Sequence, residues 1–420
     1  MPGLLFPAYQ KFYSALSNLE RFDKESNFFD NISAIDNFFN EYRNITFAMQ
    51  KSLKHTAFFS AYEKNRDLYL TDHWFVEKRN ETIKQKPFDL VKEISITLYL
   101  PFGGFTVYEK KYSVVNDVPL ESTLEELKDQ LRKVNLYEVC FSVSYSFHEA
   151  DSNIELLERA LQGVASMKHF MEAMEQDIGE QCPLCDQLKK RINDIHLTDV
   201  PLDFLLVTDY TYYPEKGYFD KAERINMFLS LTNKKVANHQ PLSNLTKAEY
   251  FNYDGTAFGN FTLMHAILRT FRPGIEIMPA IMVVYGDDTY DLDAFNATMK
   301  TTMYRKLTEA ARVVDEQNVV EICYLSLYST TIIEPETPKT SRDRILQSTS
   351  DILVCASIDN KLHEKEYVFN GKNMESMEYI VHVMQRGPKK QLDVSATNLF
   401  PIRCAFERKL SKTADDIHHV

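Results

Sequence analysis

The chain has 420 residues, an apolar content of 44% and a formal net charge of −12 at neutral pH. This length suits two domains that each bury a core of their own. The acidic balance disfavours broad, non-specific binding of nucleic acid, which needs a basic surface, although it leaves room for a local basic groove.

The sequence has neither a membrane span nor a secretion signal that we can identify. No apolar run reaches the roughly 20 residues that cross a bilayer. The N-terminus lacks the basic and small-residue pattern of a signal peptide, and the six cysteines are too sparse for a disulfide scaffold. We therefore expect no membrane contact and a cytoplasmic location.

Helices dominate the beginning of the chain. Apolar residues recur at helical spacing over residues 8–23 and 33–54. Shorter helices are predicted at 56–66 and 72–86, and Pro87 ends the last one because it lacks a backbone donor. These segments predict a helical bundle.

The pattern changes to strand-like alternation in an insertion over about residues 91–147. Two alternating runs joined by a Pro-Phe-Gly-Gly turn predict a β-hairpin, and a charged helix at 122–133 and a strand at 139–147 follow. A long helix then begins at Ser152, where Ser152 and Glu155 have the spacing of a capping box.

The second half interleaves short apolar runs with helical patterns, which favours a sheet layered with helices. We predict strands at 205–208, 281–285, 319–328, 352–357, 367–369 and 402–406, and helices at 219–231, 259–270, 291–315 and 374–384. The predicted fold is α+β: a helical bundle with a β-hairpin-containing insertion over residues 1–198, a mixed α/β sheet domain over 199–410, and a flexible tail over 411–420.

The helix predicted at 72–86 carries an Arg-Asn pair in the string FVEKRNETIKQ. Together with the aromatic-rich helix NFFNEYRNITFAMQ and the later helix NIELLERALQGVASM, this order of elements resembles bacterial HEPN-like proteins (higher eukaryotes and prokaryotes nucleotide-binding). The resemblance covers residues 1–180. It implies a helical, often dimeric bundle and, in many members, a metal-independent ribonuclease of a toxin–antitoxin or phage-defence system.

The active-site motif of that family is RNxxxH, in which the histidine helps to activate a ribose 2′-hydroxyl and the arginine stabilises the phosphate. Arg79 and Asn80 match its first part, but Lys84 stands in the place of the histidine. A lysine with an ordinary pKa of about 10.4 is protonated at neutral pH and is a poor base. His55 or His73 is an alternative base, supplied from another helix. We favour Arg79 as a bundle arginine that pairs with a carboxylate.

Cys182 and Cys185 have the Cys-x-x-Cys spacing of a zinc half-site, and His169 and His196 flank them along the chain. One hypothesis is therefore a Cys2His2 zinc site at the end of the long helix. The alternatives are a redox pair and a plain pair of cysteines in a turn between helices, and the last of these is our leading interpretation.

The string Tyr-Gly-Asp-Asp at residues 285–288 is similar to the metal-binding hairpin of RNA-dependent RNA polymerases, where two aspartates bind Mg²⁺. In that interpretation Asp287 and Asp288 are ligands and Asp209 is an upstream ligand. The chain has little room for a polymerase architecture and no basic template channel. We favour an acidic turn, with Asp293 capping the helix that follows.

These patterns favour a non-catalytic accessory or sensor protein of a bacterial defence or toxin–antitoxin type system, acting through association as a homodimer or with a partner protein. That setting rests on the resemblance alone. The alternative is a nuclease, either metal-independent at Arg79 and Asn80 or metal-dependent at Asp287 and Asp288. We expect no cofactor, with zinc at the cysteines or a divalent metal in a nuclease as the alternatives.

Overall fold

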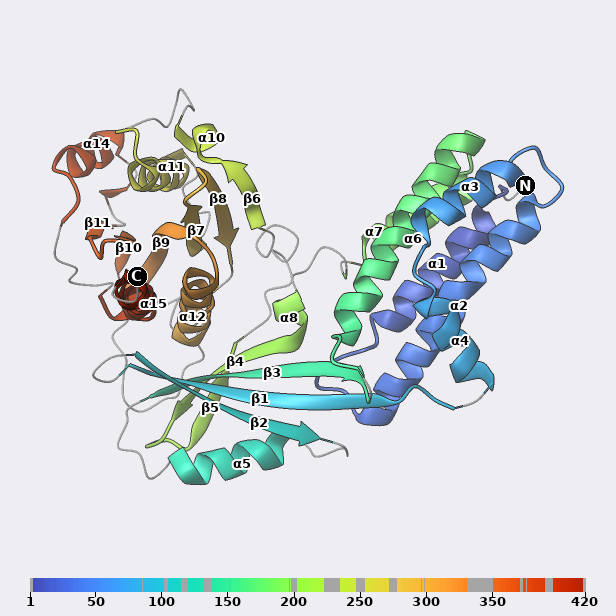
Figure 1. Ribbon diagram of the computed structural model, residues 1–420, viewed down its shortest axis with the longest axis horizontal. Helices are drawn as coiled ribbons and strands as arrows, with labels where there is room; N and C mark the ends of the chain where they lie inside the picture. The colour runs from blue at the N-terminus through green and yellow to red at the C-terminus, as the bar shows by residue number, and fades with distance from the viewer. Residues whose placement is uncertain are drawn as a thin grey trace. The chain divides into compact units, whose positions relative to one another are not determined.

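Figure 1 shows the computed structural model of the chain. It describes residues 3–84, 86–101, 105–114, 120–131, 138–150, 152–195, 197, 202–222, 235–246, 254–271, 278–295, 297, 299–330, 350–370, 373–374, 376–389 and 396–417. Unit 1, the first of two compact units, comprises Met1–Ser95, Lys110–Asp129 and Ser144–Val207, and unit 2 comprises Ile96–Glu109, Gln130–Val143 and Thr208–Val420. Within the described parts of the chain, no helix is long and apolar enough to cross a membrane.

Unit 1 is built from amphipathic helices that bury their apolar stripes against one another (Figure 1). They are α1 (Phe6–Leu19), α2 (Phe28–Leu53), α3 (Phe59–Tyr69), α4 (Trp74–Lys84), α6 (Leu156–Ile178) and α7 (Pro183–Asn193), with the separate α5 (Leu120–Leu131) in the insertion. Phe38, Phe39 and Met49 of α2 are fully buried. The predicted helices of the first half are confirmed, with shifts of a few residues at their ends.

The start of α6 differs from the predicted capping box. The helix begins at Leu156, and the carboxylate of Glu155 accepts a hydrogen bond from the N–H of Leu157 at 3.3 Å. The same carboxylate accepts bonds from the hydroxyl of Ser146 and the N–H of Phe147, both at 2.9 Å. Glu155 is the cap because strand β3 holds its carboxylate in place, and the hydroxyl of Ser152 bonds only locally.

The insertion contributes to a sheet of five described strands in the order β2-β1-β3-β4-β5. Its members are β1 (Leu90–Pro101), β2 (Phe105–Val114), β3 (Val139–Glu149), β4 (Val207–Tyr213) and β5 (Tyr218–Lys221), and the short helix α8 (Leu202–Leu206) precedes β4. The two strands of the predicted hairpin are confirmed as neighbours in the sheet, whereas the turn after Pro101 lies outside the described residues. The division between the units passes within β1 and β3. The helix predicted at 219–231 is wrong for 219–221, which lie in β5, and its remainder from 223 lies outside the described residues.

A second sheet forms the centre of unit 2, with six described strands in the order β11-β10-β9-β7-β8-β6. The strands are β6 (Lys235–Pro241), β7 (Ala280–Tyr285), β8 (Thr289–Ala294), β9 (Val319–Thr330), β10 (Ser350–Asp359) and β11 (Glu364–Asn370). All neighbours in this order pair antiparallel. Four of the strands predicted for this half are confirmed, and they correspond to β7, β9, β10 and β11.

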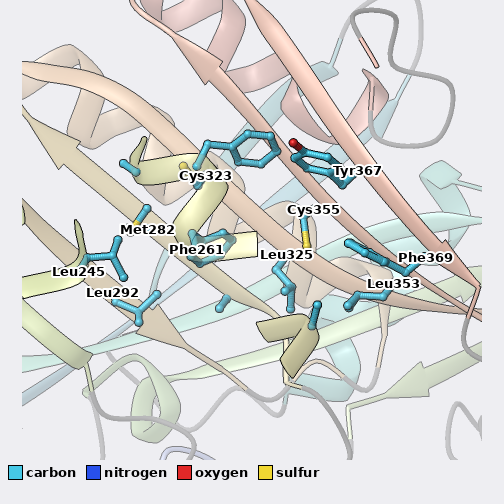
Figure 2. Close-up of a cluster of buried hydrophobic side chains, with 14 of the residues drawn as sticks. Leu245, Phe261, Met282, Leu292, Cys323, Leu325, Leu353, Cys355, Tyr367 and Phe369 are labelled. Carbon is cyan, nitrogen blue, oxygen red and sulfur yellow. The ribbon is translucent and has the colours of Figure 1, made fainter. Parts of the chain in front are cut away.

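Helices cover both faces of this sheet (Figure 1). Successive residues of β9 alternate between the faces: Cys323 and Leu325 join the core cluster under α11 (Ala257–Phe271) and α14 (Met377–Gln385), with the short α10 (Leu242–Thr246) beside them. Ile322 and Tyr324 join the cluster under α12 (Lys300–Glu316) and α15 (Ala396–Ile417). Figure 2 shows the first cluster, where Phe261 of α11 lies over the sheet.

The strand predicted at 205–208 is right only for 207 and 208, which lie in β4, because 205 and 206 lie in α8. Three further predictions for the second half are wrong. Residues 291–294 belong to β8, and the helix predicted at 291–315 begins only at Lys300, because the Thr-Tyr-Asp-Leu-Asp-Ala run pairs with β7. Residues 402–406 lie in α15, where the apolar positions follow helical spacing toward the core. The tail expected from residue 411 is helical as far as Ile417.

Candidate functional site

Arg79 and Asn80 lie in the middle of α4. One guanidinium nitrogen of Arg79 donates to the side-chain oxygen of Asn80 at 3.2 Å. The Nε atom of Arg79 is buried and donates to no acceptor among the described residues. The expected pairing of Arg79 with a carboxylate does not occur within the part of the chain that the structure describes, so that prediction is wrong there.

Two more arginines form a group with Arg79, because Arg43 interacts electrostatically with both Arg79 and Arg66. Arg43 projects from α2 and Arg66 from α3. Burial lowers the pKa of Arg43. The nearby Tyr62 raises this pKa, whereas the like charges of Arg79 and Arg66 lower it further. Arg43, Arg66 and Arg79 are the arginine cluster of unit 1.

An exposed aromatic ring adjoins the arginine cluster. The guanidinium carbon of Arg43 lies 4.3 Å from the ring centroid of Phe47, and that of Arg79 lies 5.9 Å from the same centroid. Phe47 is 43% exposed. On the α3 side, Arg66 lies 5.8 Å from the ring of Tyr62. The cluster thus combines planar cations with an aromatic surface open to solvent.

The positive charges of the cluster exceed the negative charges that contact it. Arg66 donates two hydrogen bonds to Asp67, at 2.9 and 2.7 Å. Arg43 donates to the hydroxyl of Thr46, and no salt bridge joins Arg43 or Arg79 to a carboxylate in the described residues. An anion with several acceptor oxygens is the natural complement of such a site.

The sequence-based interpretation named Arg79 but missed Arg43 and Phe47. A signal for both is present, because they are four residues apart in NEYRNITF and therefore lie on one face of a helix. Arg66 carries no such signal, since only the packing of α3 brings it near the other two.

No described side chain acts as a base for the cluster. Lys84 is the last residue of α4, and its side chain lies outside the described residues. His55 and His73 are exposed, and within the described ranges neither forms a hydrogen bond to the arginine cluster.

Cys182 and Cys185 lie together at the start of α7, but the predicted zinc ligands do not all join them. His169 is an exposed residue of α6 whose ring lies 6.4 Å from that of Tyr69, and His196 lies outside the described residues. Among the residues that are described, no three or more His, Cys, Asp or Glu side chains form a group able to hold a metal.

Asp287 and Asp288 form the turn between β7 and β8. The carboxylate of Asp287 accepts bonds from the N–H of Thr289 at 3.2 Å and from its hydroxyl at 2.6 Å. The hydrogen bond from the Thr289 hydroxyl lowers the pKa of Asp287, and burial only partly offsets this effect. Asp288 has a positive φ of 61°, and its carbonyl accepts the N–H of Leu242. Both residues therefore shape the hairpin.

The remaining acidic candidates also have structural partners. Asp209 accepts hydrogen bonds from Arg305 of α12 at 3.0 to 3.3 Å and from the hydroxyl of Ser142 at 2.6 Å. Asp293 lies within β8 and 3.7 Å from Lys306, so its predicted role as a helix cap is wrong. The cap of α12 is Met299.

Comparisons of the chain with protein-family models, with curated proteins and with solved structures find no match.

Proposed function

We propose that the helical unit is a non-catalytic sensor that binds a nucleotide at the arginine cluster. The phosphate would lie against Arg43, Arg66 and Arg79, and the base against the exposed ring of Phe47. One observation carries this proposal: two of three neighbouring arginines have no carboxylate partner in the described residues, although both are partly withdrawn from water.

The energetic argument concerns the ligand-free state. A buried donor without an acceptor, such as Nε of Arg79, costs about 1–3 kcal/mol. The mutual repulsion of Arg43 with Arg79 and Arg66 adds to this cost. A phosphate group would supply acceptor oxygens and negative charge together, and guanidinium groups bind it through paired hydrogen bonds.

The overall charge favours a nucleotide over a long nucleic acid. The chain carries a net charge of −12, so phosphates that extend beyond the cluster would be repelled by the protein. A single base can still stack on Phe47, a contact that contributes about 1–3 kcal/mol in single-stranded nucleic-acid complexes.

The resemblance to HEPN-like proteins supports a sensor role in a bacterial defence or toxin–antitoxin type system. In this proposal the ligand-bound unit acts through association, either as a homodimer or with a partner protein. The absence of a base next to the arginine cluster, within the described residues, supports recognition without cleavage.

Isothermal titration calorimetry of the full chain with AMP, ADP, ATP and inorganic phosphate tests the proposal. We expect the nucleotides to bind more tightly than phosphate, and Arg43→Met or Arg79→Met to weaken binding by about 10–100-fold, the value of one lost charge-assisted hydrogen bond. Phe47→Ala should weaken the binding of nucleotides but not the binding of inorganic phosphate. Arg159→Met is the matched control, because Arg159 also lies over an aromatic ring (Trp74, 4.3 Å) but is paired with Asp72.

Two outcomes would contradict the proposal. If no nucleotide binds, or if Arg159→Met weakens binding as much as Arg79→Met does, the arginine cluster is not the site. If labelled RNA is cleaved in EDTA and Arg79→Met abolishes the cleavage, the unit is a metal-independent ribonuclease. Metal-dependent cleavage lost in Asp287→Asn would move the activity to unit 2.

A further inference from the structure

The Cys-x-x-Cys sequence occupies the first turn of α7. Cys182 is the N-cap of that helix, Pro183 follows it, and Cys185 lies one turn along. The sulfur of Cys182 accepts hydrogen bonds from two backbone N–H groups, that of Cys185 at 3.4 Å and that of Gly3 at 3.3 Å. Donors at a helix N-terminus stabilise a thiolate over a thiol.

The pKa values of the two thiols of this turn are shifted in opposite directions. Burial opposes ionisation of Cys182, but hydrogen bonds from the Cys185 thiol and from the N–H groups of Cys185, Gly3 and Leu184 outweigh it and lower the pKa. Burial, together with the hydrogen bond and the charge of Cys182, raises the pKa of Cys185 to about 12. The turn thus holds a thiol with a lowered pKa directly beside one with a raised pKa.

The other cysteines differ from Cys182. All six are free thiols. Cys140, Cys323 and Cys355 are buried in strands, and burial raises the pKa of each. Cys404 of α15 is partly exposed, and burial also raises its pKa. Cys182 is the one cysteine whose pKa is lowered, and Cys182 and Cys185 are the one pair of cysteines within a helical turn of each other.

We propose that Cys182 and Cys185 are a redox-active dithiol, which closes to an intramolecular disulfide by exchange with a small-molecule disulfide such as oxidised glutathione. Residues three apart in a first helical turn have Cα atoms about 5–6 Å apart, which is the usual separation in a disulfide. This inference is independent of nucleotide binding at the arginine cluster.

The exchange proceeds in two balanced steps. The Cys182 thiolate attacks one sulfur of the small disulfide, and the released thiolate takes up the proton that Cys182 lost. Once Cys182 is in the mixed disulfide, it no longer carries the charge that raises the pKa of Cys185. Cys185 then loses its proton and attacks the Cys182 sulfur. The second small thiol leaves with that proton. Two protein thiols are oxidised, and one small disulfide is reduced to two thiols.

The N-terminal segment covers the dithiol. Besides the bond from Gly3, the N–H of Leu4 donates to the carboxylate of Glu180 at 2.7 Å. A Cβ atom added at Gly3 would lie 2.9 Å from the Cβ of Cys182, so only glycine allows this close approach. Cys182 is 6% exposed, and a small disulfide therefore reaches it only when this segment moves away. The charged groups around the pair are Glu180 and Lys189.

Peptide mass spectrometry of the full chain tests the proposal after incubation in glutathione redox buffers at neutral pH and acid quenching. We expect a Cys182–Cys185 disulfide in the natural sequence, and Cys185→Ser should stop at a mixed disulfide on Cys182. Cys404→Ser is the matched control and should behave like the natural sequence. Gly3→Ala should accelerate the exchange several-fold because it displaces the covering segment.

A second measurement needs no cysteine substitution. The rate of iodoacetamide labelling of the folded protein, mapped residue by residue, should rise at a lower pH for Cys182 than for Cys404. Equal pH profiles for the two, or no Cys182–Cys185 disulfide in any glutathione buffer, would overturn the proposal. Stoichiometric zinc in the purified protein that disappears in Cys182→Ser would also overturn it, because metal-bound thiolates are not free to exchange.

Discussion

Arg305 of unit 2 and Arg79 of unit 1 are both partly buried arginines on helices, but their surroundings are opposite. Arg305 donates to both carboxylate oxygens of Asp209 and, through another nitrogen, to Glu309 at 3.0 Å. Arg79 donates to the uncharged Asn80 and lies near the positively charged Arg43, and its buried Nε has no acceptor among the described residues.

This difference separates an arginine that holds the fold from one that is available to a ligand. The charge of Arg305 is already compensated, and its pairing with Asp209 attaches α12 to β4. The charge of Arg79 is uncompensated within the described residues, which costs stability unless an anion is bound. Three tests should distinguish the two cases, and a fourth examines the acidic turn between β7 and β8.

The largest effect is expected for Arg305→Met. The substitution leaves the buried carboxylate of Asp209 without its partner, which should lower the free energy of unfolding by about 3–5 kcal/mol. Urea denaturation of the full chain measures this. Arg408→Met is the control, because its pair with Asp315 is exposed and should contribute no more than about 1 kcal/mol. Equal effects of the two substitutions would contradict our view of the Asp209–Arg305 pair.

The contribution of the Asp209–Arg305 pair to the free energy of unfolding should depend on pH. Burial opposes ionisation of Asp209, but Arg305, Ser142 and Thr302 together lower the pKa of its carboxyl. A carboxyl with a lowered folded-state pKa stabilises the protein above its unfolded pKa of about 3.9, and that stability is lost as the pH falls through the folded pKa. The stability difference between the natural sequence and Arg305→Met should therefore be full at pH 7 and shrink below about pH 4. A difference that grows on acidification would contradict this assignment.

Arg79→Met should have a smaller effect of the opposite sign. Methionine keeps the apolar stem but removes the unpaired donor and the repulsion with Arg43, so the ligand-free protein should gain about 0.5–1 kcal/mol while it loses nucleotide binding. Thermal unfolding with and without nucleotide measures both. A loss of stability as large as that of Arg305→Met would show that Arg79 has a structural partner after all.

The smallest effect is expected for Asp287→Asn. An asparagine oxygen can still accept the bonds from Thr289, so the melting temperature should be the same as that of the natural sequence, as for other surface substitutions. Melting temperatures of both proteins with Mg²⁺ and with EDTA provide the measurement. A Mg²⁺-dependent stabilisation that is lost in Asp287→Asn would show that the turn binds a metal.

Local patterns predicted most of the regular structure. The apolar stripe of α2 and the alternation in β9 repeat over many residues, so helix and strand could be read from them directly. The errors lie where the pattern is short. Residues 291–294 were assigned to a helix, although pairing with β7 makes them a strand, and residues 402–406 were assigned to a strand, although they face the core from α15.

Only part of the candidate site could be predicted from the sequence. Arg79 was identified through a dipeptide, and its neighbour Asn80 through the same string. The expected carboxylate partner of Arg79 is not found among the described residues. Partner choice depends on which helices pack together, and α2 brings Arg43 close to Arg79 instead. Asp209 was considered as an upstream metal ligand of the Tyr-Gly-Asp-Asp string. Its pairing with Arg305 could not be read from the sequence, because 96 positions separate the two residues.

The sequence by itself determined the α+β class, most helices and strands, and the short distance between Cys182 and Cys185, because each of these depends on interactions within a few residues. Only the tertiary structure decided that Arg79 of α4 lies near Arg43 and Phe47 of α2, and that the N–H of Gly3 reaches the sulfur of Cys182 across 179 positions. Such contacts form when packed helices bury their apolar faces, and the charges and donors that meet at the edges of those faces follow from the packing rather than from any local pattern.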